Sequence, residues 1–158
     1  MARKDISMSN DEAAAFIERG HTLIVASVGR HGMPHVAPMW YVVDDGRVVF
    51  RSFTKSQKIT NLRRDPRITA LIETGEKYAE LQGLMIEGQA TLIDDPGYTL
   101  GIYGRLAAKY PMVGSEPVIL EGEALEAAFG RHATKNTSVI VEPDRIVTWD
   151  HTKLAGEY

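Results

Sequence analysis

The alternation of apolar and polar residues along the chain predicts a protein built mainly from short antiparallel strands. Thr22 to Val28 is β-branched and apolar, and a hairpin loop, Gly29 to Met33, follows it. Asp44-Asp45-Gly46 is typical of a tight turn between two further strands. The predicted strands are residues 22–28, 35–43, 47–53, 68–73, 82–93, 138–141 and 146–149, and the last two are expected to pair across a turn at 142–145.

Helix-start signals place four helices between these strands. Ser9 to Glu12 forms a capping box, and the helix that it begins is expected to end at Gly20. Asp95 followed by Pro96 predicts an N-cap and first turn of a helix that reaches about Lys109. A second capping box, with Thr54 as N-cap and Gln57 three residues later, begins a short helix, and residues 123–129 predict another. Strands with turn signals and a few peripheral helices predict a small antiparallel barrel.

A basic segment follows the strand at residues 47–53. Residues 51–67 carry a net charge of +5 in a chain whose net charge is −3, so the remainder carries −8. A concentrated positive region on an acidic protein indicates an anionic partner, and the local chemistry favours a phosphate. The basic residues are Arg51, Lys55, Lys58, Arg63, Arg64 and Arg67.

The helix start within this segment suits an anion. Lysines near a helix N-terminus oppose the helix dipole, at a cost of about 0.3–1 kcal/mol each when exposed. A bound anion reverses that penalty, because the dipole, the free N–H groups and the ammonium groups then all attract it. Ser52, Thr54 and Ser56 would add hydroxyl donors. The alternative is a solvated basic helix, since lysine and arginine are usually surface residues.

Composition narrows the chemistry that the chain can supply itself. With 158 residues, we expect a single domain over residues 1–158. Cysteine is absent, so thiol nucleophiles and thiolate metal sites are excluded, and the five histidines lack a metal-binding spacing. No Walker A, G-x-G-x-x-G or G-x-S-x-G pattern occurs, and no catalytic or metal-binding residue is identified. An acidic chain without an apolar leader or spanning segment predicts a cytoplasmic protein that binds neither nucleic acid nor membrane.

Two further segments are candidates for the walls of a flat binding slot. The hairpin places the strand 35–43 beside the strand 47–53, at about 5 Å. Pro38 within a strand implies an edge or a bulge, which would leave backbone groups free to face a heterocycle. Tyr78, in the polar loop 74–80, could cover a bound ring or belong to a simple surface loop. The remaining wall residues are Met39, Trp40 and Tyr41. The alternative to a slot, which their residue types favour, is core packing for Met39 and core or dimer packing for Trp40 and Tyr41.

Taken together, these segments resemble the flavin/deazaflavin split-barrel family related to pyridoxamine 5′-phosphate oxidase. The resemblance rests on Ser56-x-Lys58, Asp65-Pro66 and Ile86-Glu87-Gly88 in that order, and on the closing segment Val139 to Leu154. It implies a mainly β, six-stranded antiparallel split β-barrel with peripheral helices, which forms a homodimer with cofactor sites at the interface. It further implies that the segment from Arg51 to Lys58 holds the cofactor phosphate and that Pro38 to Tyr41 lies along the ring.

Within that family, Pro38-Met39-Trp40-Tyr41 and Lys55-Ser56-Gln57-Lys58 look most like the branch that uses coenzyme F-420, a deazaflavin. The expected function is hydride transfer from reduced F-420 to a conjugated small-molecule acceptor. The alternatives are an FMN-dependent oxidase or reductase of the same fold and a non-catalytic deazaflavin-binding protein. The chain ends at residues 154–158 without the Arg-Leu-x-Pro of true pyridoxamine phosphate oxidases, so that reaction is not expected.

Overall fold

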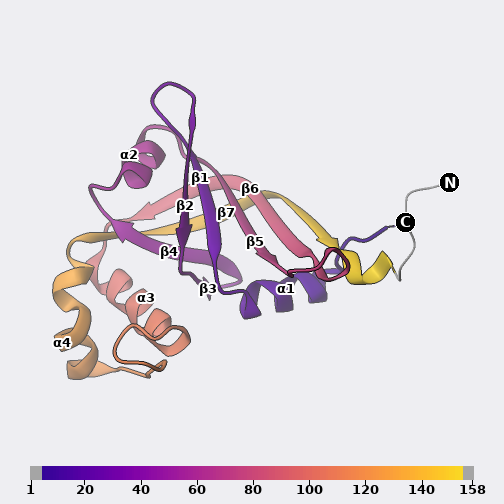
Figure 1. The fold of residues 1–158 in the computed structure, drawn as a ribbon. Helices are drawn as coiled ribbons and strands as arrows, with labels where there is room; N and C mark the ends of the chain where they lie inside the picture. Colours follow the sequence, from indigo (N-terminus) through magenta and orange to yellow (C-terminus); the bar gives the residue numbers. More distant parts are fainter. Residues whose placement is uncertain (1–4, 155–158) are drawn as a thin grey trace.

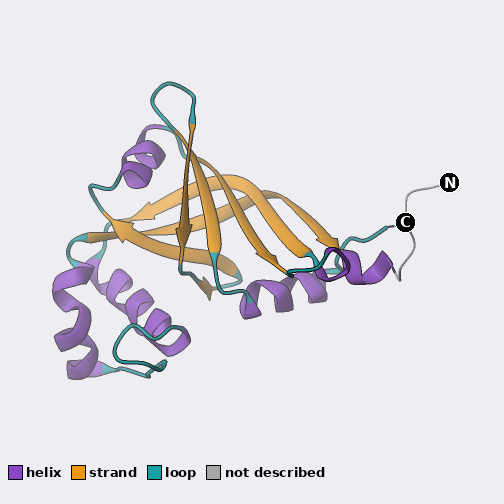
Figure 2. Ribbon diagram, in the orientation of Figure 1, coloured by secondary structure: helices purple, strands orange, loops and turns teal. Residues whose placement is uncertain are grey.

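The computed structural model describes residues 5–154 and shows one curled antiparallel sheet with helices at its ends and side (Figures 1 and 2). Within these residues the sheet has seven strands in the order β2-β1-β5-β6-β7-β4-β3. The mainly β class is therefore confirmed, with one strand more than the six that the family resemblance implies. The chain-terminal residues 155–158, on which the comparison with true oxidases rested, lie outside the described residues. The strands are β1 (Leu23–Val28), β2 (Pro34–Met39), β3 (Val42–Asp44), β4 (Arg47–Phe53), β5 (Arg67–Thr74), β6 (Gln82–Ile93) and β7 (Asn136–Asp150).

Four α-helices and two short 3₁₀ helices complete the described chain. The Ser9 capping box and the Asp95 N-cap are both confirmed, because each side chain accepts a hydrogen bond from the backbone of its helix. The predicted helix at residues 123–129 is longer than expected. None of the helices within residues 5–154 combines the length and the apolar character needed to cross a bilayer. The helices are α1 (Asn10–Arg19), α2 (Gln57–Arg64), α3 (Pro96–Lys109), α4 (Gly122–Ala133), η1 (Tyr78–Glu80) and η2 (His151–Leu154).

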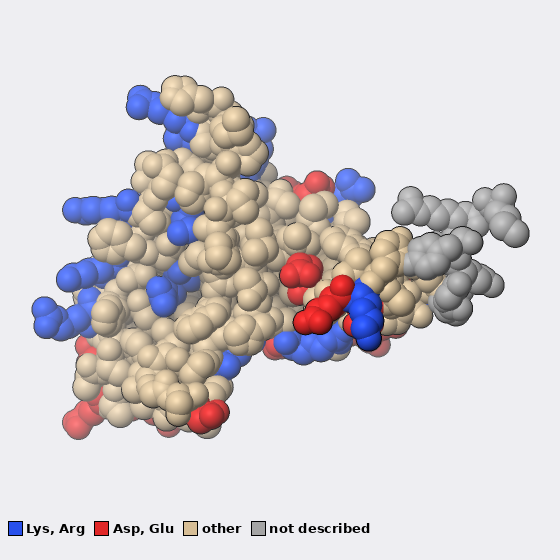
Figure 3. Space-filling model, in the orientation of Figure 1, with Lys and Arg blue, Asp and Glu red and all other residues tan. Residues whose placement is uncertain are grey.

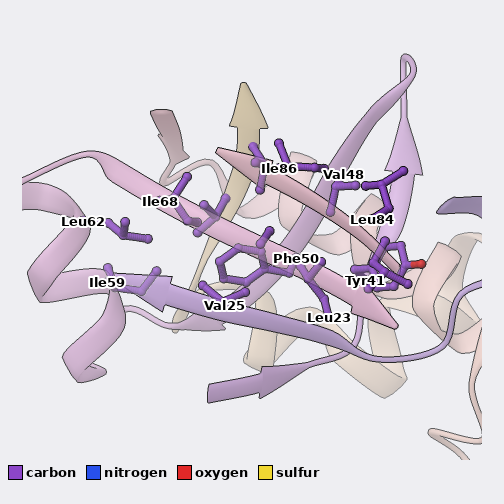
Figure 4. Close-up of a cluster of buried hydrophobic side chains, with 14 of the residues drawn as sticks. Leu23, Val25, Tyr41, Val48, Phe50, Ile59, Leu62, Ile68, Leu84 and Ile86 are labelled. Carbon is purple, nitrogen blue, oxygen red and sulfur yellow. The ribbon is translucent and has the colours of Figure 1, made fainter. Parts of the chain in front are cut away.

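The main core fills the inside of the curled sheet (Figure 4). Strand alternation sends Leu23 and Val25 of β1 and Leu84 and Ile86 of β6 to this inner side, where all four are at most 3% exposed. α1 adds Phe16, and α2 adds two buried residues, so both helices are anchored by apolar packing. A second core joins α3 to the other face of β4 and β7, through residues such as Val49, Ile102 and Leu106.

The predicted strand 35–43 is wrong as one element, because the chain leaves the sheet at Trp40 and Tyr41. Tyr41 turns its side chain into the core, and its backbone N–H donates to the hydroxyl of Tyr110 at 3.2 Å instead of to a strand. The two halves become β2, which pairs with β1, and β3, which pairs with β4, at opposite edges of the sheet. Pro38 therefore lies on an edge strand, as predicted, but β2 is not the hairpin partner of β4.

The predicted hairpin at 138–149 is also wrong, because β7 is one strand of 15 residues. Its two halves pair with successive parts of β6 and not with each other, from Ser138 beside Ile93 to Asp150 beside Gln82. Residues 142–145, which were expected to form a turn, lie within β7 and form an irregularity in its pairing with Glu87 and Gly88 of β6. A turn-forming sequence thus becomes a bulge where a long neighbouring strand offers continuous pairing.

Candidate functional site

The start of α2 differs from the predicted capping box and is more open to an anion. The N-cap is Ser56 and not Thr54, and the Ser56 side chain makes no capping hydrogen bond to the helix. The first turn contains no acidic residue. The N–H groups of this turn therefore lack a side-chain acceptor from the N-cap, which leaves them available to a negatively charged group.

A short chain of donors leads from Lys58 to this helix start. Lys58 Nζ donates to Ser52 Oγ at 3.3 Å, and Ser52 Oγ lies 3.1 Å from Ser56 Oγ. Ser52 is 5% exposed, whereas Ser56 is only half-buried. Lys58 donates to Ser52, and either serine could be the donor in the contact between Ser52 and Ser56. If Ser52 donates, the Ser56 proton is free for a further acceptor. These three side chains form the group that we call the anion cradle: Ser52, Ser56 and Lys58.

Lys58 is a partly buried cation without a carboxylate partner in the part of the chain that the structure describes. Burial, with a smaller contribution from the charge of Arg51, lowers the pKa of Lys58 below its ordinary value. Both effects mean that the ammonium is less stable here than in water. A bound anion would relieve this cost, so the donor set of the anion cradle fits a phosphate.

The Thr54 and Gln57 side chains form hydrogen bonds with residues outside this cradle. Thr137 donates its only hydroxyl proton to the Asp94 carboxylate at 2.6 Å, so Thr54 must be the donor in its 3.0 Å contact with Thr137. The Gln57 amide donates to Asn61 Oδ1 at 2.8 Å. Both side chains therefore stabilise the start of α2 through these hydrogen bonds.

Lys55 and Arg51, the other basic residues of the segment expected to hold the phosphate, lie apart in the structure. Lys55 is exposed at the loop before α2, where an anion on the cradle could recruit it. Arg51 precedes Ser52 in β4 and faces the opposite side of the sheet, where its guanidinium carbon lies 4.6 Å from the centre of the Tyr103 ring. Arg51 is thus placed beside α3 rather than in the anion cradle.

A pocket of about 330 Å³ opens between the edge strand β2 and strand β4. This volume is at the lower end of the usual range for small-molecule sites. Trp40 forms one wall and stacks on Tyr110, with ring centres 4.7 Å apart and planes 12° from parallel. A flat aromatic wall beside a cation suits a planar, oxygen-bearing ring. The lining residues are Thr22, Pro38, Met39, Trp40, Arg51 and Leu106.

Two of the predicted ring contacts lie elsewhere. Tyr41 is fully buried, and its hydroxyl donates to the carbonyl of Ile17 at 2.6 Å, so it is a core residue that joins the sheet to α1. Tyr78 packs against His151, with ring centres 4.5 Å apart, and η1 lies at the end of β5 that is far from α2 (Figure 1). Within one chain the structure does not bring Tyr78 to the pocket.

Several residues of the site gave no signal in the sequence. Leu106 and Tyr103 belong to α3, which sequence patterns marked only as a helix, and Tyr110 lies just beyond the predicted end of that helix. Their roles arise because α3 folds back against β4. Figure 3 shows lysine and arginine side chains projecting from the same side of the molecule as α2, whereas the acidic side chains in this view lie along the lower edge or farther right.

Comparisons with known proteins find a matching family model and solved structures with this fold. The family model described as pyridoxamine 5′-phosphate oxidase matches residues 9–149. A search of the curated proteins finds no match. Among solved structures, the conserved hypothetical protein Rv2991 from Mycobacterium tuberculosis is 32% identical with a TM-score of 0.87, and the match covers 100% of this chain and 94% of that one.

More distant structures share the fold alone. A structure named F420 reductase is 22% identical with a TM-score of 0.63, over 84% of this chain and 94% of that chain. An FAD-binding protein from Mesorhizobium loti is 16% identical with a TM-score of 0.65, over 90% and 94%. Proteins named for two different ring cofactors thus use this arrangement of strands.

Proposed function

The chain belongs to the pyridoxamine 5′-phosphate oxidase family, and on that premise we propose that it is an oxidoreductase that binds a phosphorylated flavin-type cofactor. The observation that carries this proposal is Lys58, a partly buried cation without a carboxylate partner within residues 5–154, beside the uncapped start of α2. The cofactor phosphate would lie on the anion cradle. The ring would extend toward the pocket walled by Trp40 and Met39.

Within this class we propose coenzyme F-420 as the cofactor and a conjugated small molecule as the acceptor. The support comes from the local sequence at residues 38–41 and 55–58 and from the charge of the region. F-420 carries a phosphodiester and a tail of glutamates, which can engage more cations than the single phosphate of FMN. The exposed Lys55, beside the cradle, suits such an extended anion.

The reduced deazaflavin would supply the hydride, and this chain would supply binding and orientation. The anion cradle fixes one end of the cofactor, and the rigid Trp40–Tyr110 stack limits the positions that the ring can take. The lining within residues 5–154 contains no carboxylic acid, histidine or tyrosine, and the hydroxyl of the neighbouring Tyr110 is engaged with the backbone of His21 and Tyr41. Solvent would then deliver the proton, and proximity would provide most of the acceleration.

We also propose that the working form is a homodimer with the cofactor sites at its interface. Ile24, Leu71, Met85 and Val147 are neighbours in register across four strands and form one apolar row. Their strand positions alternate with the core residues, so this row faces outward. A second copy of the chain could cover it. Met85→Glu should then shift the mass in light scattering from dimer to monomer, whereas a wild-type monomer would contradict the proposal.

Titration of the purified apoprotein with F-420 and with FMN tests the proposed function. We expect tight binding of F-420 and weak binding of FMN, followed by steady turnover of quinones or enones with reduced F-420. Tight FMN binding without F-420 binding would assign the chain to the FMN-dependent alternative. F-420 binding without turnover of any acceptor in the panel would favour a cofactor carrier.

A further inference from the structure

Arg51 is held by aromatic packing and not by a carboxylate. Its guanidinium lies over the face of Tyr103, which is 3% exposed and is itself stacked on Phe129 with ring centres 4.8 Å apart. None of the carboxylates within residues 5–154 forms an ion pair with Arg51. Tyr103 is thus a fixed platform, and it sets the place of the guanidinium in the absence of an anion.

The geometry of β4 explains why Arg51 and the anion cradle are separate. Arg51 pairs in register with Ser138, whose hydroxyl contacts Thr99 of α3 at 2.9 Å, so this register position faces α3. Ser52, the next residue, faces the opposite side and contacts Lys58. Adjacent residues of one strand therefore serve two different regions of the site.

Contact with the Tyr103 ring leaves N–H groups of the Arg51 guanidinium available to a ligand. Guanidinium N–H groups lie in the plane of the group, whereas contact with an aromatic ring uses its face. Arg51 also lines the pocket, together with Met39, Trp40 and Leu106. Leu106 lies on α3, one helical turn beyond Tyr103. The N–H groups can therefore reach an oxygen atom at the edge of a flat molecule in this pocket.

We propose that Arg51 binds the oxygen-bearing edge of the cofactor ring rather than the phosphate, and that Tyr103 is the positioning residue that aims it. This inference rests on the proposed function. It assigns a role to the α3–α4 pair, which is inserted between β6 and β7 and supplies both Tyr103 and Phe129. Recognition of the two ends of the cofactor is then divided between the two faces of β4.

Binding of F-420 and of its phosphate-free deazaflavin chromophore separates the two roles. Arg51→Gln should weaken both ligands by a similar factor, roughly tenfold or more for a lost charged hydrogen bond. Lys58→Gln should weaken F-420 and leave the phosphate-free chromophore unchanged. Arg51→Lys should restore part of the affinity. Arg105→Gln is the matched control, because Arg105 lies on α3 but pairs with Asp44 outside the pocket.

Tyr103 variants test the positioning role. Tyr103→Leu removes the aromatic face and should reproduce part of the Arg51→Gln loss for both ligands, whereas Tyr103→Phe keeps the face and should retain the affinity. Absorbance titration of the bound chromophore gives a second readout, because a nearby guanidinium stabilises the ionised ring and lowers its pKa. Arg51→Gln should raise that pKa, and Lys58→Gln should not.

Four outcomes would overturn the inference. Arg51→Gln that weakens only the phosphorylated ligand would make Arg51 a phosphate ligand, and Arg51→Gln that changes neither affinity would remove it from the site. No measurable binding of the phosphate-free chromophore to wild type would show that the ring edge is not recognised. Wild type that binds neither F-420 nor FMN would overturn the proposed function and this inference together.

Discussion

The Lys58 ammonium donates to Ser52 Oγ at 3.3 Å, and this contact joins the first turn of α2 to the end of β4. It holds a cation at the N-terminus of a helix, where the helix dipole disfavours it. Such an arrangement is costly in the free protein and favourable when an anion is bound. Substitutions at Lys58 therefore test whether this cost serves a ligand.

Removal of the Lys58 charge should weaken cofactor binding more than removal of the Lys55 charge. Lys58→Gln is expected to lose about 1–3 kcal/mol of binding free energy, because a charge-assisted contact is lost in a partly buried site. Lys55→Gln should lose less, since Lys55 is exposed and its contacts with the cofactor tail are screened by solvent. Fluorescence titration measures both, and equal affinity of Lys58→Gln and wild type would contradict the prediction.

Cofactor affinity should fall at alkaline pH because of Lys58. Burial lowers the pKa of Lys58 below 10.5 in the free protein, and a bound phosphate would raise it again. The complex therefore holds more protons than the free protein as the pH rises through the lowered pKa, so binding weakens there and is unaffected at lower pH. Titrations from neutral pH to about pH 10 would show this fall in wild type.

Lys58→Arg provides the control for that pH dependence, because its guanidinium stays charged throughout this range. Ionisation of the cofactor ring affects both proteins alike and cancels in the comparison. Identical pH profiles for wild type and Lys58→Arg would show that Lys58 does not titrate at the site.

Tyr41→Phe should destabilise the protein and leave cofactor affinity intact. The Tyr41 hydroxyl donates to the Ile17 carbonyl, which lies in the last turn of α1, and its loss leaves a partly buried acceptor without this donor. We expect a loss of about 1–2 kcal/mol in the free energy of unfolding, measured by urea denaturation. A large loss of cofactor affinity with unchanged stability would instead indicate that Tyr41 contacts the cofactor ring.

Two glycine substitutions should act in opposite directions. A Cβ at Gly88 would clash with the carbonyl oxygen of Glu142 at the irregularity of β7, so Gly88→Ala should cost about 1–3 kcal/mol of unfolding free energy. A Cβ at Gly101, on the exposed side of α3, meets nothing within 4 Å. Gly101→Ala should stabilise the protein by about 0.5–1 kcal/mol through helix propensity. Equal midpoints in thermal denaturation would contradict this contrast.

Features that depend on a few neighbouring residues could be predicted from the sequence. The Ser9 and Asp95 caps formed as expected, because each hydrogen bond closes within three residues along the chain. The hairpin loop after β1 also formed as expected. Pro38 lies on an edge strand, as its missing backbone N–H predicts. The basic segment was also found, because its charge is visible without any knowledge of the fold.

Features that depend on distant partners could not be predicted. The break at Trp40 and Tyr41 is set by Tyr110, which lies 69 residues from Tyr41. The N-cap is Ser56 and not Thr54, and the Thr54 hydroxyl contacts Thr137, which is 83 residues away. The contact between Arg51 and Tyr103 has the same origin, since Tyr103 reaches Arg51 only after α3 packs on β4.

A crystal structure of the protein with bound F-420 tests the central claim most directly. The account predicts a phosphate oxygen within about 2.7–3.2 Å of Lys58 Nζ and of a backbone N–H in the first turn of α2. F-420 bound elsewhere on the protein, with Lys58 and that first turn in contact only with solvent, would contradict it.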